Sequence, residues 1–392
     1  MSFELTTQAT AELPKLSAYV HVPWCVRKCP YCDFNSHAAD ADNIPEAEFL
    51  QRIEQDIKQD AGLAQGRKIE SLFFGGGTPS LLSAQAIGRI IELLAQHVGF
   101  SDGAEITLEA NPGTVEADRF IGYRKAGVNR LSMGIQSFND DHLKVLGRIH
   151  SADEAKTAFA LAREAGFDNI NLDLMHGLPE QTLQQALADL NSAIELAPEH
   201  LSWYQLTIEA NTEFYNKPPA IPDDDRLWEI QQAGQERLAE AGYNQYEVSA
   251  YAKQQRQCRH NLNYWRYGDY LGIGPGAHGK YSHWQADELH ITRTRKTRLP
   301  RDYLNQQKPL VRLEESVPLE DRPFDYFMNS LRLRESTDLA DFINFTSVPL
   351  AHIEPTLQLL QEKGFIDWQS NSIVTTTKGY LYLNEVLACW LE

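Results

Sequence analysis

The chain has 392 residues, of which 42% are hydrophobic and 23% charged, and it carries a net charge of −18 at pH 7. This composition is typical of a folded globular protein, and the length predicts two or three domains, or one barrel with an appended domain. The acidic balance argues against a general nucleic-acid-binding protein, which needs a basic surface.

The N-terminal sequence MSFELTTQATAELPKL lacks a basic start followed by an apolar block, so we expect no signal peptide. No apolar run in the sequence is long enough to cross a bilayer. We therefore expect a protein of the reducing cytoplasm. In that compartment clustered cysteines more often bind metals or take part in catalysis than form disulfides.

Short segments rich in β-forming residues alternate with amphipathic helical segments over the first 210 residues. Strands are predicted at 17–23, 69–75, 105–110, 128–135, 169–175 and 200–206. The helices between them include 46–62, 83–97, 115–126, 152–165 and 183–196. This alternation implies parallel strands with right-handed crossovers, in either an open sheet or a barrel.

Polar residues gather where the predicted strands end. Glu109, Gln136 and Asp173 stand at three strand ends, the sequence GGGTP (75–79) follows another strand, and a cysteine-rich loop follows the first. Functional groups collected from the carboxyl ends of many strands are typical of βα barrels. Because six units are predicted rather than eight, we expect an α/β fold with a partial (β/α)6 barrel that is open on one side.

After residue 210 the alternation ends. A helix is predicted at 226–241 and a short strand at 245–249, and an aromatic and glycine-rich stretch follows at 258–279. The basic stretch RTRKTRLPR (293–301) is interpreted as a solvated strand or loop. A binding patch for carboxylates or phosphates is the alternative.

The C-terminal part predicts a helix at 350–364, a hairpin at 365–376 and a final helix at 377–391. This order is winged-helix-like, and the acidity of the chain favours a packing or lid role over DNA binding. We expect three regions, namely the partial barrel (1–250), a connecting segment with the HNLNYW sequence (251–305) and a C-terminal, mostly helical domain (306–392).

The cysteine-rich loop has the spacing C-x3-C-x2-C, formed by Cys25, Cys29 and Cys32. Three thiolates on one short loop can hold three corners of a [4Fe–4S] cluster and leave the fourth iron open. The competing interpretation is a zinc site completed by His21 or His37.

The sequence CVRKCPYC resembles the C-x3-C-x-aromatic-C signature of radical S-adenosylmethionine (SAM) enzymes. Further motifs resemble, in the same order, the coproporphyrinogen III dehydrogenase-like subfamily: AYVHVPWCVRKCPYCDFNSH, FFGGGTPSLL, LEANPGT, RLSMGIQSFND, LGRIH and NLDLMHGLPEQT. The resemblance covers roughly the whole chain. It favours the iron–sulfur cluster over zinc, because spaced motifs rarely coincide by chance.

The resemblance implies that SAM chelates the open iron and that the protein binds, orients and shields this cofactor. Tyr31 would lie against the adenine, and Arg148 suits the carboxylate of SAM. Glycines after the second strand would let backbone groups approach the methionyl end. The SAM-contacting residues implied in this way are Tyr19, Tyr31, Gly76, Gly77, Thr78, Glu109, Gln136, Arg148 and Asp173.

One position departs from the porphyrinogen-oxidising members of the subfamily. Those members carry a further cysteine two positions after the third, where this chain has Phe34. The sequence HNLNYW instead resembles the H-N-x-x-Y-W sequence of HemW-type heme chaperones. The resemblance implies His260 as an axial heme ligand, with Tyr264 and Trp265 against the porphyrin.

Other residues compete for these roles. Without the resemblance, His260 is better interpreted as a histidine packed in an aromatic cluster, and His278 and His283 are rival heme ligands. Arg266 or the basic stretch 293–301 would meet the heme propionates.

Together these features predict a heme chaperone that delivers heme to hemoproteins and carries a [4Fe–4S] cluster and SAM. We expect no coproporphyrinogen dehydrogenase activity. The alternative is an oxygen-independent coproporphyrinogen III dehydrogenase, and a third candidate is a radical SAM enzyme for another tetrapyrrole. Heme and recipient hemoproteins are the expected partners and nucleic acid is not, while peripheral membrane association and a homodimer stay open.

Overall fold

The computed structural model describes residues 12–114 and 117–391. Parallel strands form the centre of its main sheet: β1 (Leu16–Val22), β4 (Ile69–Gly76), β5 (Phe100–Ala110), β6 (Arg130–Gln136), β7 (Ile170–His176) and β8 (His200–Gln205). They coincide with the six strands predicted from the sequence, and they are neighbours in chain order.

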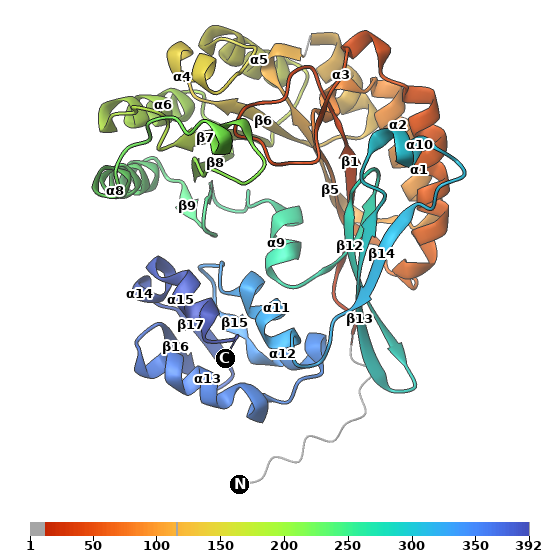
Figure 1. Cartoon of the computed structure of the whole chain (residues 1–392), viewed down its shortest axis with the longest axis vertical. Coiled ribbons are helices and arrows are strands. Elements are labelled where there is room, and N and C mark those ends of the chain that lie inside the picture. Colours follow the sequence, from red (N-terminus) through yellow and green to blue (C-terminus); the bar gives the residue numbers. More distant parts are fainter. Residues whose placement is uncertain (1–11, 115–116, 392) are drawn as a thin grey trace.

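Helices connect these strands and cover the outer side of the sheet (Figure 1). They are α1 (Glu46–Asp60), α2 (Ala84–His97), α3 (Ala117–Ala126), α5 (Ala152–Glu164) and α6 (Leu183–Glu195). The five predicted helices are confirmed, except that residues 115 and 116 lie outside the described residues. Capping boxes fix two helix starts, at Ser151 with Glu154 and at Thr182 with Gln185.

The two faces of each strand differ, because successive side chains of a strand point to opposite sides. In β1, Ala18, Val20 and Val22 belong to the large hydrophobic core shared with the helices. The alternate residues Tyr19 and His21 point to the inner side. The partial barrel therefore has an apolar outer face that binds the helices and a polar interior that is available for ligands.

Strands from the second half of the chain extend the sheet on both sides. Beyond β8 lie β10 (Ala250–Ala252) and β9 (Asn244–Gln245), and beyond β1 lie β11 (Asp269–Ile273), β12 (His278–Gln285), β13 (Glu288–Lys296) and β14 (Val311–Ser316). β11 is parallel to β1, and β12, β13 and β14 follow as antiparallel neighbours. In the described residues β9 and β14 stand at opposite edges, so the barrel is open.

The basic stretch 293–301, predicted to be a solvated strand or loop, is only partly solvated in the structure. Lys296, in β13, is completely buried and its ammonium group lies 2.6 Å from Asp60, with Asp56 as a second partner. Both acids belong to α1, which joins the extension to the barrel. α10 (Pro300–Leu304) adds Tyr303, whose hydroxyl donates a hydrogen bond of 2.6 Å to Asp56.

The remaining helices of the first part are α4 (Asp140–Val145), α7 (Glu213–Asn216), α8 (Asp224–Glu240) and α9 (Arg259–Trp265). The helix predicted at 226–241 corresponds to α8. The HNLNYW sequence lies on α9. The cysteine loop is bounded by β2 (Trp24–Cys25) and β3 (His37–Ala38), which pair with each other.

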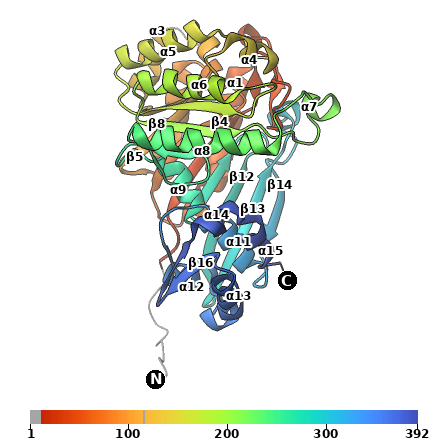
Figure 2. The same cartoon turned by 90° about the vertical axis from the view of Figure 1, so that its left-hand side faces the viewer.

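A second hydrophobic core holds the C-terminal elements together. They are α11 (Arg322–Ser330), β15 (Thr337–Asp338), α12 (Leu339–Thr346), α13 (Leu350–Glu362), β16 (Ile366–Gln369), β17 (Ser372–Thr375), α14 (Thr377–Leu381) and α15 (Leu383–Ala388). The predicted helix 350–364 and the hairpin are confirmed. Both Figure 1 and Figure 2 place these elements below the barrel.

The predicted single helix at 377–391 is wrong, because the chain forms two short helices there. Tyr382 between them has φ −109° and ψ 38°, which is not helical. Gly379 brings α14 against the hairpin, since a Cβ atom at this position would lie 2.0 Å from the carbonyl oxygen of Phe365.

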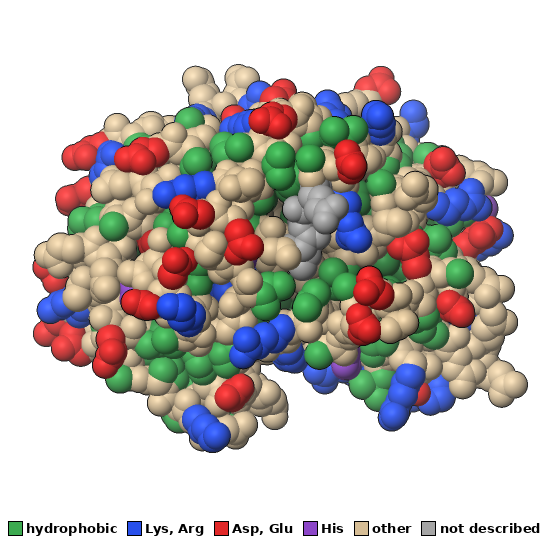
Figure 3. All heavy atoms as spheres, turned by 90° about the horizontal axis from the view of Figure 1, so that it is seen from above, with side chains coloured by type: hydrophobic (Ala, Val, Ile, Leu, Met, Phe, Trp, Pro, Cys, Tyr) green, Lys and Arg blue, Asp and Glu red, His purple; other side chains and the backbone are tan. Residues whose placement is uncertain are grey.

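The end of the molecule opposite to these elements carries charged side chains of both signs, with hydrophobic side chains exposed between them (Figure 3). No helix among the described residues is both long and apolar enough to span a membrane.

Candidate functional site

The carboxyl ends of the parallel strands bring several predicted site residues together. The backbone amide of Gly76, at the end of β4, donates a hydrogen bond of 3.2 Å to the carboxylate of Glu109 in β5. Gly76 has φ +111°, and a Cβ atom there would lie 2.4 Å from the ring of His21. Only glycine fits this position, because both the conformation and the space exclude a side chain.

Glu109 and Asp173 face the barrel interior from β5 and β7. Burial, and to a smaller extent the nearby Asp173, raises the pKa of Glu109 to about 8. Burial also raises the pKa of Asp173, against hydrogen bonds from Asn171 at 2.9 Å and Ser132 at 3.0 Å. Both side chains keep a partly accessible surface. Two carboxylates in one sheltered space favour a cationic ligand, which would supply the missing countercharge.

The glycine-rich turn after β4 holds the cysteine loop by backbone contacts. Gly77 and Thr78 donate hydrogen bonds of 2.7 Å to the carbonyl oxygens of Val22 and Trp24. A Cβ atom at Gly77 would lie 2.5 Å from the carbonyl oxygen of Trp24. The first function of this turn is therefore to bring β4 close to the start of the cysteine loop.

The three cysteines are free thiols with partly accessible side chains. Burial raises the pKa of Cys25 and of Cys32, and the neighbouring thiols of the loop raise both further. The amide of Cys32 donates a hydrogen bond of 3.2 Å to the carbonyl oxygen of Cys29. The loop is thus a compact turn that presents three thiols and forms no disulfide.

Three thiols on one short loop suit an iron–sulfur cluster. Among the described residues, no group of three His, Cys, Asp or Glu side chains is arranged around one metal ion. His21, proposed as a zinc ligand, has both ring nitrogens within hydrogen-bond distance of other groups, at 3.0 Å from Tyr19 and 2.9 Å from Asn35. A cluster bonds each thiolate to a different iron, so its thiols need not converge on one point.

Asn35 fastens the loop to the extension of the sheet. Its side-chain amide donates hydrogen bonds of 2.9 Å to the carbonyl oxygens of both Pro275 and Arg298. Its side-chain oxygen lies 3.1 Å from the ring of His37. This residue was not predicted from the sequence, since nothing in the CDFNSH stretch indicates partners 240 and 263 positions away.

Arg148 reaches the cysteine loop from the segment between α4 and α5. Its guanidinium group lies 3.6 Å from the sulfur of Cys29 and also binds the carbonyl oxygen of Gly134. A narrow cavity beside this contact is lined by Val26, Arg27, Cys29, Thr78, Asn111, Gly147, Arg148 and Ile149. One of the three thiols, Cys29, thus shares a cavity with the predicted SAM residues Thr78 and Arg148.

The other predicted SAM residues lie nearby in different surroundings. Gln136 accepts a hydrogen bond of 2.7 Å from Tyr204 of β8, a residue that the sequence analysis did not select. The alternation of β8 could have revealed Tyr204 as an inward residue. Tyr31 is half-buried, and its ring lies 6.4 Å from that of Phe214 in α7.

His260 does not occupy a position suited to a heme ligand. It is 1% exposed, and its ring nitrogens lie 3.1 Å from the hydroxyl of Ser71 and 3.0 Å from that of Tyr264. Ser71 is near the start of β4, five residues before Gly76, which corresponds to about 16 Å along the strand. The structure therefore shows a packed histidine whose two ring nitrogens both lie near hydroxyl groups.

The aromatic residues of HNLNYW have the same structural role. His260 stacks on Phe73 with ring centroids 5.1 Å apart, and Tyr264 packs edge-on against Tyr270. The backbone amide of His260 and that of the preceding residue both donate to Glu105, in the middle of β5. α9 therefore closes the amino end of the barrel interior, away from the cysteine loop.

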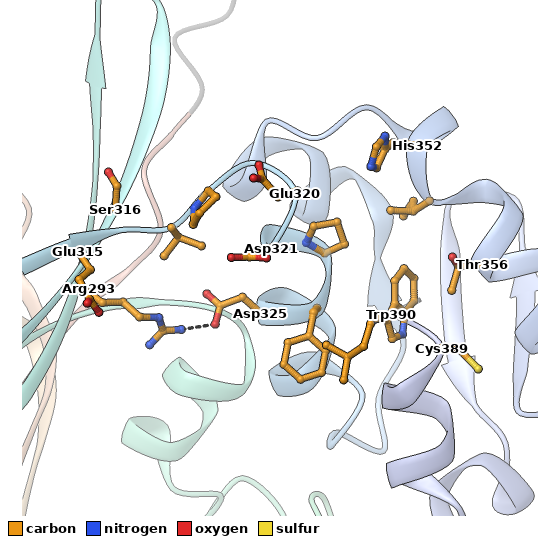
Figure 4. Close-up of a pocket in the computed structure, with 16 residues that line it drawn as sticks. Arg293, Glu315, Ser316, Glu320, Asp321, Asp325, His352, Thr356, Cys389 and Trp390 are labelled. Carbon is orange, nitrogen blue, oxygen red and sulfur yellow. Dashed lines mark hydrogen bonds and ion pairs between the residues drawn. The ribbon is translucent and has the colours of Figure 1, made fainter.

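A larger cavity, of about 630 Å³, lies between the C-terminal elements and the strands β13 and β14, from which Arg293, Glu315 and Ser316 line it. Figure 4 shows Glu320, Asp321 and Asp325 on one side and His352 and Trp390 on the other. The carboxylates disfavour an anionic ligand. This cavity contains none of the residues predicted for the cluster or for SAM.

Comparison with known proteins agrees with this geometry. Residues 19–193 match the radical SAM superfamily, and residues 317–382 match the HemN C-terminal domain. The solved coproporphyrinogen III oxidase (HemN) of Escherichia coli, described as a radical SAM enzyme, superposes with a TM-score of 0.81 at 25% identity, over 96% of this chain and 90% of that one. The fold and the site thus define a radical SAM protein.

Curated relatives identify the family within the radical SAM superfamily. The protein "Heme chaperone HemW" of Haemophilus influenzae is 51% identical over 97% of this chain and 99% of its own length. Its counterpart in Escherichia coli is 50% identical with the same coverage, and that of Bacillus subtilis is 33% identical over 96% of this chain and 99% of its own length. The chain belongs to the HemW family. Membership of the radical SAM superfamily implies SAM and an iron–sulfur cluster.

Proposed function

We propose that this protein is a heme chaperone, which binds heme and delivers it to hemoproteins. The observation that carries the proposal is the identity of about one half to relatives named heme chaperone, over nearly the whole length of both chains. The matched region covers 97% of this chain and therefore includes most of the barrel and of the C-terminal elements. Heme is thus the cargo, and recipient hemoproteins are the partners.

We further propose that Cys25, Cys29 and Cys32 hold a [4Fe–4S] cluster. The loop offers three partly accessible thiols without a disulfide, and Asn35 and Arg148 fix its position. The chemistry that a cluster of this type supplies with SAM is one-electron cleavage of a carbon–sulfur bond. The protein's own residues bind and orient these groups and exclude water from them.

The proposed SAM site lies across the carboxyl ends of the strands. Glu109 and Asp173 offer negative charge to a cationic ligand, and Arg148 offers positive charge to a carboxylate. Tyr19, Tyr31, Gly76, Gly77, Thr78 and Gln136 complete the proposed set, in which the glycines provide a close backbone approach.

The enzyme alternative is not favoured. The HemN structure shares the fold, but its identity to this chain is 25%, against about 50% for the heme chaperones. This chain has Phe34 where the resemblance leads us to expect a further cysteine in porphyrinogen-oxidising members. We therefore propose that the chain does not oxidise coproporphyrinogen III.

One sample tests both functions. The protein is purified without oxygen and reconstituted with iron and sulfide, and one portion is titrated with heme while another is incubated with coproporphyrinogen III, SAM and a reductant. We expect saturable heme binding and no protoporphyrinogen. Protoporphyrinogen formed at many turnovers, with no heme binding, would establish the enzyme instead.

Further proposals concern the setting of this function. We propose that the protein acts in the cytoplasm, and peripheral membrane association and a homodimer are the two further states to be tested. Sedimentation with and without heme, and flotation with lipid vesicles, distinguish these states.

A further inference from the structure

We propose that heme binds on the inner face of the β11–β12–β13 extension, beside the cysteine loop, with His278 as its axial ligand and Arg295 and Arg298 bound to its propionates. This inference rests on the proposed heme-chaperone function and adds the location of the heme. It places the ligand at the end of the barrel opposite to α9.

The register of the sheet places His278 on the face that also carries the proposed SAM site. Tyr19 of β1 pairs with Gly272 of β11, and paired residues in neighbouring strands point to the same face. Gly272 lies directly against His278, since a Cβ atom on Gly272 would be 1.9 Å from the carbonyl oxygen of His278. His278 in turn pairs with Arg295 of β13.

His278 is accessible and has an available ring. Its side chain is exposed, and no described residue forms a hydrogen bond with it. Burial of part of the ring lowers its pKa, and the nearby Arg295 and Arg293 lower it further. The ring is therefore neutral at physiological pH, and neutral imidazole is the form that binds iron.

Two cations suit a dicarboxylate, since Arg295 pairs with His278 and Arg298 lies against Gly276, two residues before His278. Arg295 and Arg298 are exposed, and neither forms an ion pair with a described residue. In a chain of net charge −18, such unpaired arginines are available for an anionic ligand. Arg293 on the same strand differs, because it is already paired with Asp325. Heme carries two propionates, and guanidinium groups bind carboxylates in bidentate geometry.

The cysteine loop supplies an apolar neighbour. Phe34 is 62% exposed, so its ring is available to contact a ligand. The next residue, Asn35, binds the carbonyl oxygens of Pro275 and Arg298, and thereby brings the loop to the turn between β11 and β12. An exposed aromatic ring next to a cationic surface suits the apolar face of a porphyrin.

The other histidines fit less well. His260 is buried with both nitrogens engaged, and His283 stacks between Tyr281 and His290, away from the cysteine loop. His352 borders the larger cavity, which is lined by several carboxylates that would repel propionates. Among the described histidines, His278 alone combines an accessible ring with two unpaired arginines.

The test compares heme binding by single variants of the reconstituted full-length protein. His278→Ala is expected to shift the Soret band and to weaken heme binding about tenfold or more, equivalent to about 1.4 kcal/mol. Arg295→Gln with Arg298→Gln is expected to weaken heme binding to a similar extent. That double variant should leave binding of heme dimethyl ester unchanged, because the ester has no propionate charges. His352→Ala, another exposed histidine, is the control and should bind heme like the wild type.

The outcomes separate this inference from the proposed function. Wild-type protein that binds no heme would overturn the function and the site together. Heme binding that survives both the His278 and the arginine variants would overturn the site alone, as would a Soret band that changes in His260→Ala and not in His278→Ala. His278→Gln provides a second variant, and SAM binding with thermal unfolding verifies that each protein is folded.

Discussion

The amide of Gly76 and the carboxylate of Glu109 are joined by a hydrogen bond of 3.2 Å across neighbouring strands. This contact fixes Glu109 at the carboxyl ends of the strands, where Asp173 also faces inward. Because a neutral side chain loses less solvation than a charged one on burial, Glu109 without a ligand retains its proton to about pH 8. A cationic ligand that binds at the proposed SAM site should therefore displace the proton of Glu109.

Glu109→Gln should weaken SAM binding about tenfold and remove most of its pH dependence. In the wild type, a cationic ligand favours the ionised carboxylate, so binding releases protons and strengthens as the pH rises toward about 8. Calorimetry in buffers of different ionisation enthalpy measures this release. Glu164→Gln, on the exposed side of α5, is the matched control. Equal proton release in wild type and variant would contradict the assignment.

Ionisation of Glu109, which should strengthen SAM binding as the pH rises, should lower the stability of the ligand-free protein over the same pH range. Folding raises the pKa of Glu109 from 4.5 to about 8. The contribution of this group to the free energy of unfolding is therefore fully present below pH 4.5 and is lost as the pH rises to about 8. Ligand-free Glu109→Gln should therefore exceed the wild type in stability at pH 9, by roughly 1–3 kcal/mol. Chemical denaturation at pH 5 and pH 9 checks this. A stability difference between variant and wild type that does not grow with pH would contradict this prediction.

Asn35→Ala should loosen the cysteine loop, because the loop loses both bonds to the sheet extension. The expected result is a cluster lost to a chelator about tenfold faster, as for other residues that support metal ligands. Iron release with EDTA measures the rate. Asn43→Ala is the control, since Asn43 is exposed and bonds only to Asp40. Identical rates in both variants would show that Asn35 does not support the cluster.

His260→Ala should destabilise the protein by about 2–4 kcal/mol, because it removes a buried ring with two hydrogen-bonded nitrogens. The Soret band of bound heme should stay unchanged. Urea denaturation and absorbance spectra of one preparation check both statements. His352→Ala is the exposed control and should unfold like the wild type. A normally stable His260→Ala with an altered Soret band would restore His260 as the ligand.

Lys296→Met should destabilise the protein by about 3–5 kcal/mol, because it leaves the buried carboxylates Asp56 and Asp60 without their cation. Thermal unfolding measures the loss. Lys308→Met removes a lysine whose ion pair with Asp302 is exposed, and should have a much smaller effect. Equal effects of the two substitutions would argue against a role of the buried triad in joining β13 to α1.

The six parallel strands could be predicted because each has a local apolar pattern and is followed by an amphipathic helix. Glu109, Gln136 and Asp173 could be selected because they stand at strand ends. The pairing of β1 with β11 could not be predicted, since the paired residues Tyr19 and Gly272 are far apart in the sequence and no local pattern specifies their register.

The heme ligand shows a second limit. The HNLNYW sequence indicates that His260 is important, but it does not reveal which end of the barrel α9 closes. Burial against Ser71 and Phe73 depends on the three-dimensional arrangement of α9 and β4. The different roles of the residues in the basic stretch 293–301 also depend on the three-dimensional arrangement. Lys296 faces α1, while Arg295 faces the opposite side of the strand.

Heme transfer tests the central claim most directly. The protein is loaded with one equivalent of heme, freed of excess heme, and mixed with an apo-hemoprotein whose holo form has a distinct Soret band. The account predicts that the acceptor spectrum appears and that the spectrum of the loaded protein disappears in equal amount, with slower or smaller transfer from His278→Ala. No heme retained after removal of the excess, or heme retained without transfer to any acceptor, would contradict it.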